Sequence, residues 1–177
     1  MRYRFVHTMP TAWSLEEQEL LDEAVTFTND YVGDDFFRDV SVFISEKLAI
    51  DYVVIGKFVQ PDNEKIRTLI AVHDGEPFGN FDYDVKNTPC EHVLINGVCF
   101  YPSDVADHFP EDVALQELSI QSYMGTPLTD VDDNRIGLIV LMNIGEIRNP
   151  NLVQTFLTII SPRIEEEILK GEQQAAG

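Results

Sequence analysis

The sequence is poor in basic side chains and in cysteine. It contains 12 Lys and Arg against 31 Asp and Glu, which gives a formal net charge of −19. Phosphate contacts need clustered Lys and Arg, so this balance argues against a nucleic-acid-binding protein and against docking on an anionic membrane surface. Two cysteines in 177 residues are too few for a disulfide-stabilised scaffold. We therefore expect neither a nucleic acid nor a membrane as partner.

Long hydrophobic runs are also absent. The longest apolar stretches, such as residues 136–142, fall far short of the roughly 20 residues needed to span a bilayer. The opening stretch, MRYRFVH, lacks the apolar core of a signal peptide. We expect a cytoplasmic protein whose thiols stay reduced.

What the sequence does contain is enough apolar material for one folded domain. Hydrophobic residues make up 44% of the chain and charged residues 24%, which is too apolar for a disordered acidic tail. The length also fits one domain. Residues 1–13 include the helix breaker Pro10 and are predicted to form an irregular lead. We expect a single domain over residues 14–177.

Helices are predicted at both ends of this domain. Ser14 and Glu17 have the spacing of a capping box, and an apolar stripe predicts a helix from Leu15 to Tyr31. The same spacing predicts a second helix over residues 36–48 and a last helix after residue 150. Pro162 should kink or break the last helix, because proline removes one hydrogen bond and clashes with the preceding turn. Residues 172–177 are expected to fray.

Strands are predicted where β-branched and aromatic residues gather between turns. The expected strands form two hairpins: 52–59 with 66–72, joined by a turn at 61–64, and 122–128 with 135–142.

The middle of the chain is predicted to combine a loop with short helices. Residues 73–86 are predicted to form a loop that carries three aromatic side chains. Thr88 is the expected N-cap of a short helix that ends near Gly97, with Pro89 at its first position and Glu91 completing a capping box. A short strand at 98–101 and helical turns near residues 103–105 and 110–112 should follow.

This order of elements predicts an α+β domain. Strands that come in hairpins, rather than alternating with crossover helices, form an antiparallel sheet. We expect the terminal helices to cover one face of the sheet. The segment 74–119 should arch over the other face.

The middle and C-terminal motifs resemble the GAF domain family. The resemblance covers about residues 15–169 and is closest to GAF sensor domains associated with bacterial histidine kinases and diguanylate cyclases. The motifs that carry it are NTPCEHVL (87–94), GVCFYP (97–102), FPED (109–112), SYMGTPL (122–128) and GLIV (137–140).

The resemblance implies a small-molecule pocket on one sheet face and a homodimer through the terminal helices. The pattern typical of cyclic-nucleotide GAF domains is absent, so cyclic GMP is not expected and the ligand is unknown. The residues that the resemblance places in the pocket are Phe81, Tyr83, Cys90, Val93, Phe100, Tyr101, Val105, Tyr123 and Pro127.

Cys90 allows two interpretations. In the first turn of a helix, backbone amides and the helix dipole can lower a thiol pKa, which would make Cys90 reactive. Alternatively, Cys90 is a small hydrophobic side chain packed under the lid. A metal site formed with His92, Cys99 and His108 is disfavoured, because the spacing matches no zinc-finger pattern.

We predict a non-catalytic, small-molecule-binding sensory or regulatory domain. One alternative is a thiol-based enzyme similar to the free methionine sulfoxide reductases, a GAF branch that relies on cysteines in this region. Cys90 and Cys99 could serve there, although no cysteine lies near residues 110–114, where that branch has another. The other alternative is a dimerisation module whose pocket has closed.

Overall fold

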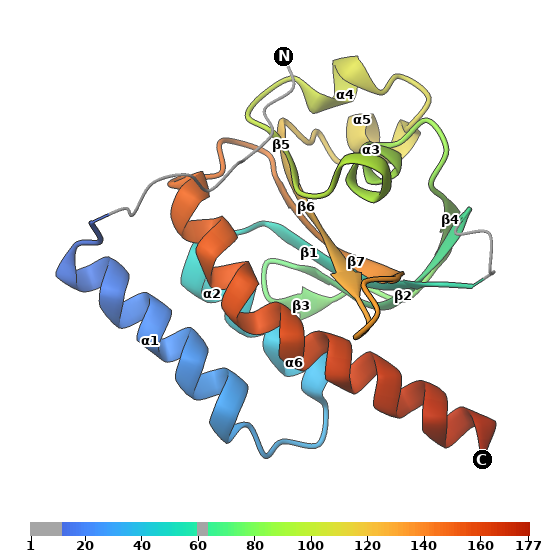
Figure 1. Cartoon of the computed structure of the whole chain (residues 1–177). Coiled ribbons are helices and arrows are strands. Elements are labelled where there is room, and N and C mark those ends of the chain that lie inside the picture. The colour runs from blue at the N-terminus through green and yellow to red at the C-terminus, as the bar shows by residue number, and fades with distance from the viewer. Residues whose placement is uncertain (1–11, 60–63) are drawn as a thin grey trace.

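An antiparallel sheet of seven strands forms the middle layer of the computed structural model, which describes residues 12–59 and 64–177 (Figure 1). The strand order is β3-β2-β1-β7-β6-β5, and β4 also pairs with β2. The strands are β1 (Tyr52–Phe58), β2 (Lys65–His73), β3 (Glu76–Pro77), β4 (Asp82–Asp84), β5 (Cys99–Tyr101), β6 (Ser122–Thr129) and β7 (Arg135–Asn143).

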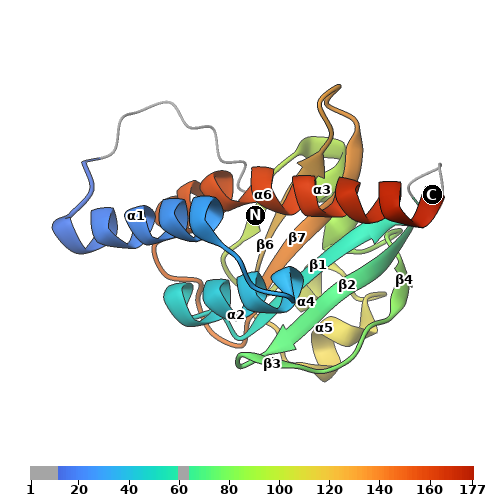
Figure 2. The same ribbon diagram turned by 90° about the horizontal axis from the view of Figure 1, so that it is seen from below.

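Helices cover both faces of this sheet (Figures 1 and 2). One face carries α1 (Leu15–Asp30), α2 (Phe36–Leu48) and α6 (Pro150–Ala176), and the other carries α3 (Pro89–Asn96), α4 (Val105–His108) and α5 (Val113–Glu117). The predicted α+β class and both predicted layers are confirmed. No helix among the described residues is long and apolar enough to cross a membrane.

Alternation along β1 divides the apolar side chains between two cores. Val53 and Ile55 belong to the core under α1, α2 and α6, whereas Tyr52 and Val54 belong to the core under α3–α5. All four are buried. Successive side chains of a strand point to opposite faces, so the nearly continuous apolar run of β1 is typical of a strand covered on both sides.

The N-terminal helix begins as predicted. The Glu17 amide donates to Ser14 Oγ over 3.2 Å, and the Ser14 amide donates to Glu17 Oε2 over 2.8 Å, which completes the capping box. The other predicted capping box is wrong. Thr88 Oγ1 donates to the Val85 carbonyl instead, and Glu91 accepts from the Asn87 amide. The Thr88 hydroxyl therefore closes the preceding turn rather than capping α3.

The segment predicted as a loop over residues 73–86 contains two short strands. β3 and β4 both pair with β2, the strand that follows β1 toward that edge of the sheet. The Arg67 guanidinium donates to both carboxylate oxygens of Asp82 at 2.9 Å across the second pairing. Edge strands leave backbone groups unpaired, and local hydrophobicity does not reveal such short pairings.

Two further predictions fall on residues outside the described part. The irregular lead predicted for residues 1–13 lies largely on residues 1–11, and the predicted turn at 61–64 includes residues 61–63.

The last helix runs through Pro162 without the break that was one of the two predicted outcomes (Figure 1). Pro162 and Thr158, whose carbonyl loses its helical partner, are both exposed. The missing hydrogen bond therefore faces solvent, while the buried Ile160, Ile164 and Ile168 hold the helix on the sheet. The residues expected to fray are helical as far as Ala176, and all of them are exposed.

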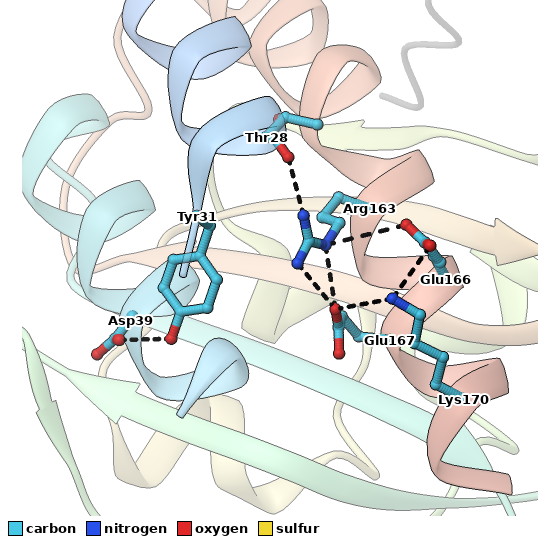
Figure 3. Close-up of polar contacts among 7 residues, drawn as sticks. All are labelled: Thr28, Tyr31, Asp39, Arg163, Glu166, Glu167 and Lys170. Carbon is cyan, nitrogen blue, oxygen red and sulfur yellow. Dashed lines mark hydrogen bonds and ion pairs between the residues drawn. The ribbon is translucent and has the colours of Figure 1, made fainter. Parts of the chain in front are cut away.

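Arg163 follows Pro162 in the middle of α6 and connects this helix to the end of α1 and the start of α2 (Figure 3). Its guanidinium donates to the Thr28 carbonyl near the end of α1 over 3.1 Å and pairs with Glu167 at 3.0 Å. It also lies 5.3 Å from the centre of the Phe36 ring in α2. A cation at carbonyls that lack helical partners stabilises a helix C-terminus. Arg163 thus fixes α1 and α2 against α6.

Replacement of Arg163 should destabilise the helical layer. We expect Arg163→Met to lower the free energy of unfolding by about 1.5–3 kcal/mol, the range for partly buried hydrogen bonds to a charged group. Arg163→Lys should recover only part of this loss, because an ammonium lacks the planar fork of donors. Urea denaturation measures both. Lys170→Met is the control, because Lys170 pairs with Glu166 and Glu167 at the exposed surface. An equal loss in Lys170→Met would contradict the assignment.

Gly125 sets the close approach of α3 to the sheet. A Cβ added at Gly125 would collide with Val93 of α3 and lie 2.7 Å from the Tyr123 hydroxyl. Gly125→Ala should therefore cost about 1–3 kcal/mol, as overpacking of a core does. Gly145→Ala is the matched control, because nothing lies within 4 Å of its added Cβ. Equal unfolding midpoints for the two variants in chemical denaturation would refute the close approach.

Candidate functional site

A pocket of about 370 Å³ opens between the sheet and the segment that covers it. Its volume lies at the small end of the range for ligand sites, roughly 300–1,000 Å³. The residues that line it are Val54, Phe78, Phe81, Tyr83, Asp84, Lys86, Thr88, Cys90, Glu111, Asp112, Val113, Ala114, Leu115, Leu118, Tyr123, Val140 and Met142.

The sheet side of the pocket comes from neighbouring central strands. Val54 of β1 pairs directly with Val140 of β7, and Met142 of β7 pairs with Tyr123 of β6. Val54, Val140 and Tyr123 are buried. Along each strand these side chains alternate with those of the core under α1, α2 and α6. They therefore share one face of the sheet and present a single apolar patch to the pocket.

Aromatic rings from the covering segment form one wall. The centres of the Phe78 and Phe81 rings lie 6.3 Å apart, and those of Phe81 and Tyr83 lie 5.9 Å apart. Thr68 of β2 holds this wall, since its amide donates to the Phe81 carbonyl and its Oγ1 accepts from the Phe81 amide. Phe78 is 46% exposed and Phe81 44% exposed. Apolar rings that line a pocket and remain this open are available to a ligand.

Cys90 lies between two phenol groups at the inner wall. Its sulfur is 3.4 Å from the Tyr83 hydroxyl and 3.3 Å from the Tyr123 hydroxyl. Burial raises the thiol pKa of Cys90 above its ordinary value, against the hydrogen bonds from Tyr123 and Tyr83, which lower it. Burial also raises the pKa of both tyrosines. The three groups are therefore neutral at neutral pH. This direction favours the second interpretation of Cys90, a small side chain packed under the covering segment, over a thiol activated by the helix.

The outer part of the pocket carries charged side chains. The lining includes three acidic side chains, Asp84, Glu111 and Asp112, and one basic side chain, Lys86. The Asn87 side-chain amide donates to Glu111 Oε2 over 2.6 Å, which joins the segment before α3 to the segment before α5. Burial raises the pKa of the half-buried Asp112 carboxyl, and the backbone amides of Leu115 and Ala114 act in the opposite direction.

Four of the nine predicted site residues, Phe81, Tyr83, Cys90 and Tyr123, line the pocket. Whether they contact a ligand stays a prediction. The other five do not line it. Phe100 lies in the opposite core, under the terminal helices. It neighbours Tyr101 in β5, and adjacent strand residues cannot face the same side.

The remaining predicted residues have packing roles on the pocket side of the sheet or near it. Val93 belongs to α3 and is fully buried against Gly125 of β6. Val105 is fully buried in the core under α3–α5. Tyr101 is buried and shares a hydrogen bond of 2.6 Å with His92 Nδ1. Pro127 pairs with Leu138 further along β6 and is only partly buried. Val93, Val105 and Tyr101 thus pack the covering segment onto the sheet, and none of the four residues lines the pocket.

Sequence reasoning missed the sheet side of the pocket and its carboxylates. Val54, Val140 and Met142 could have been found from strand alternation, once the register with Tyr123 was known. Asp112 gave no signal of this kind, because an acid before a short helix is ordinarily interpreted as a cap. The structure places this acid at the start of α5, as a cap residue would be, and its side chain also lines the pocket.

The four residues considered for a metal site do not converge on one point. His92 contacts Tyr101, His108 Nδ1 bonds to the Asp104 carbonyl, and Cys99 Sγ donates to the Gly97 carbonyl. Within the described ranges, no group of three or more His, Cys, Asp and Glu side chains could hold a metal ion.

Comparisons with known proteins identify the family. The chain matches the GAF domain family over residues 17–168. The GAF domain from a phosphoenolpyruvate-protein phosphotransferase of Coxiella burnetii is similar in structure, with a TM-score of 0.71 at 12% identity over 92% of this chain and 98% of that one. The free methionine-R-sulfoxide reductase from Neisseria meningitidis, solved with its substrate, gives 0.67 at 14% identity over 96% and 99%.

A third similar structure is a chromophore-binding domain. The chromophore-binding domain of Stigmatella aurantiaca bacteriophytochrome gives a TM-score of 0.67 at 14% identity, and the match covers 88% of this chain but 60% of that one. At these identities the similarity concerns the fold alone. No protein of curated function matches this sequence significantly.

GAF domains are commonly sensory ligand-binding domains in signalling. The family match spans most of the sequence, and solved GAF domains share the observed arrangement of sheet and helices. This chain belongs to the GAF domain family.

Proposed function

We propose that this chain is a non-catalytic sensory domain that binds a small molecule between the sheet and the 74–119 segment. The observation that carries the proposal is the pocket of about 370 Å³, lined by apolar and aromatic side chains with a few polar groups. Both α3 and α5 contribute to its lining, so a bound molecule would order the covering segment. A homodimer through the terminal helices stays a prediction.

The sheet gives a route from the pocket to the terminal helices. Val140 and Met142 line the pocket from one face of β7, while Ile139 and Leu141 of the same strand belong to the core under α1, α2 and α6. A ligand changes an equilibrium only through different affinities for two arrangements. Two packings of α6 on β7, with different pocket shapes, would meet this condition.

Filling the pocket tests the proposal. A thermal-shift screen of a metabolite library should find compounds that raise the melting temperature of the natural chain. Met142→Trp should abolish these shifts, because the indole would occupy the sheet side of the pocket. Ile144→Trp should retain them, because Ile144 lies two residues away, is 49% exposed and does not line the pocket. Shifts that survive in Met142→Trp would mean that the compounds bind elsewhere, and a screen without any shift would overturn the proposal.

A second candidate function is a thiol-based reductase. Cys90 and Cys99 both belong to the core under α3–α5, and the Cys90 sulfur lies 3.3 Å from the hydroxyl of Tyr123 in the same core. The similar structure from Neisseria meningitidis is a free methionine-R-sulfoxide reductase. The raised thiol pKa of Cys90 disfavours this function, because the thiolate is the nucleophile in such chemistry.

Thiol reactivity separates the two functions. Iodoacetamide at neutral pH should label Cys90 at least about tenfold more slowly in the folded chain than in urea, because a thiol with a raised pKa holds less thiolate. Labelling should quicken as the pH rises toward the thiol pKa. A coupled NADPH assay on free methionine sulfoxide should show no turnover. Turnover that disappears in Cys90→Ala or Cys99→Ala would establish the reductase instead.

A further inference from the structure

Acidic side chains outnumber basic ones around the pocket. Asp84, Glu111 and Asp112 line it, and Lys86 is the only Lys, Arg or His among the lining residues. Asp84 has a partner in Lys65 at 3.9 Å, and Glu111 accepts a hydrogen bond from Asn87. Asp112 forms no ion pair with any residue of the described ranges. It is thus the one lining carboxylate without a compensating side chain.

Asp112 acts on the interior of the pocket. The carboxyl is half-buried at the start of α5. Burial is the main cause of the raised pKa of Tyr83 and of Cys90, which form the inner wall, and the charge of Asp112 adds to the rise in both. The field of the carboxylate therefore reaches the space that a ligand would fill. In such partly desolvated surroundings a charge interacts more strongly than it does in water.

The interior holds no positive group that would favour an anion. Cys90, Tyr83 and Tyr123 are hydrogen-bonded to one another and neutral. The N-terminus of α3 already has an acid, Glu91, in its first turn, where it accepts from the Asn87 amide. The favourable site for negative charge at that helix end is therefore occupied by the protein itself.

The aromatic wall adds a second reason to favour a cation. Phe78, Phe81 and Tyr83 form a row of rings that begins at the exposed mouth and ends at Cys90. The faces of aromatic rings attract ammonium groups within about 6 Å of the ring centre. Apolar rings and one carboxylate that lacks an ion-pair partner among the described residues together match a molecule with a hydrophobic body and a positive head.

We propose that the pocket selects a small organic cation, a protonated amine on an aromatic or apolar body, with Asp112 as its counter-charge and the ring faces of Phe81 and Tyr83 toward its positive head. This inference rests on the proposed function, since it names the class of ligand for the same pocket. It excludes phosphates and carboxylates as preferred ligands.

The test compares ligands that differ only in the charge of the head group. Tryptamine, tryptophol and indole-3-propionate share one indole-ethyl body with an ammonium, a hydroxyl or a carboxylate, and 2-phenylethylamine, 2-phenylethanol and 3-phenylpropionate form a second series. Dissociation constants from ligand-observed NMR should show the amines binding at least about tenfold more tightly than the matching carboxylates. A tenfold preference corresponds to about 1.4 kcal/mol.

Variants then assign the preference to Asp112. Asp112→Asn should remove most of the preference for the amines and leave the alcohols within about twofold. Glu117→Gln is the matched control, because it removes the same charge from an exposed position of α5 that does not line the pocket. Phe81→Leu, at a partly exposed position, should weaken the amines more than the alcohols. It keeps the inference testable if Asp112→Asn folds poorly.

The outcomes distinguish the two proposals. Carboxylates that bind as tightly as the amines, or amines unaffected by both Asp112→Asn and Phe81→Leu, would overturn the charge selection while leaving a functional pocket. If no compound of either series binds and the metabolite screen also finds none, the proposed function fails and this inference fails with it. Compounds from the screen that bind in the pocket and are anionic would overturn the charge selection alone.

Discussion

The constraint on which this structure depends is that its central strands are buried on both faces. In β1, Val53 and Ile55 are fully buried on one side, and Tyr52 and Val54 are buried on the other. Exposing either side to water would cost roughly 1.5–3 kcal/mol for each large apolar side chain. The chain therefore needs a layer on each face, and it provides them differently. Long helices close one face, whereas short helices and strands cover the other.

This difference explains why the pocket lies where it does. The terminal helices present continuous apolar stripes, such as Ile160, Ile164 and Ile168 of α6, that fill their side of the sheet. The helices α4 and α5 are only 4 and 5 residues long and contribute few side chains each. Where they and β4 fail to fill the space above Val140 and Tyr123, a cavity remains. A region with short elements is also one in which local opening costs the least free energy.

Cys90 shows how the tertiary environment can reverse a local tendency. In the first turn of α3, the backbone amides favour a thiolate. Burial between Tyr83 and Tyr123 acts in the opposite direction and dominates, so the pKa rises. Position in a helix therefore indicated less about this thiol than its burial, which depends on residues far apart in the sequence. The same tyrosines complete the inner wall, which makes Cys90 part of the pocket lining without making it a nucleophile.

The sequence alone determined the elements whose signals are local. The capping box at Ser14, the apolar stripes of α1, α2 and α6, and the two long hairpins were predictable, because each depends on spacing within a few residues. Only the tertiary structure decided which side chains share the pocket. Val54, Val140 and Asp112 meet there through strand register and the path of a covering segment, which are set by contacts between residues far apart in the chain. For the same reason Phe100 lies in the opposite core, and Pro162 interrupts no helix because its missing hydrogen bond faces water.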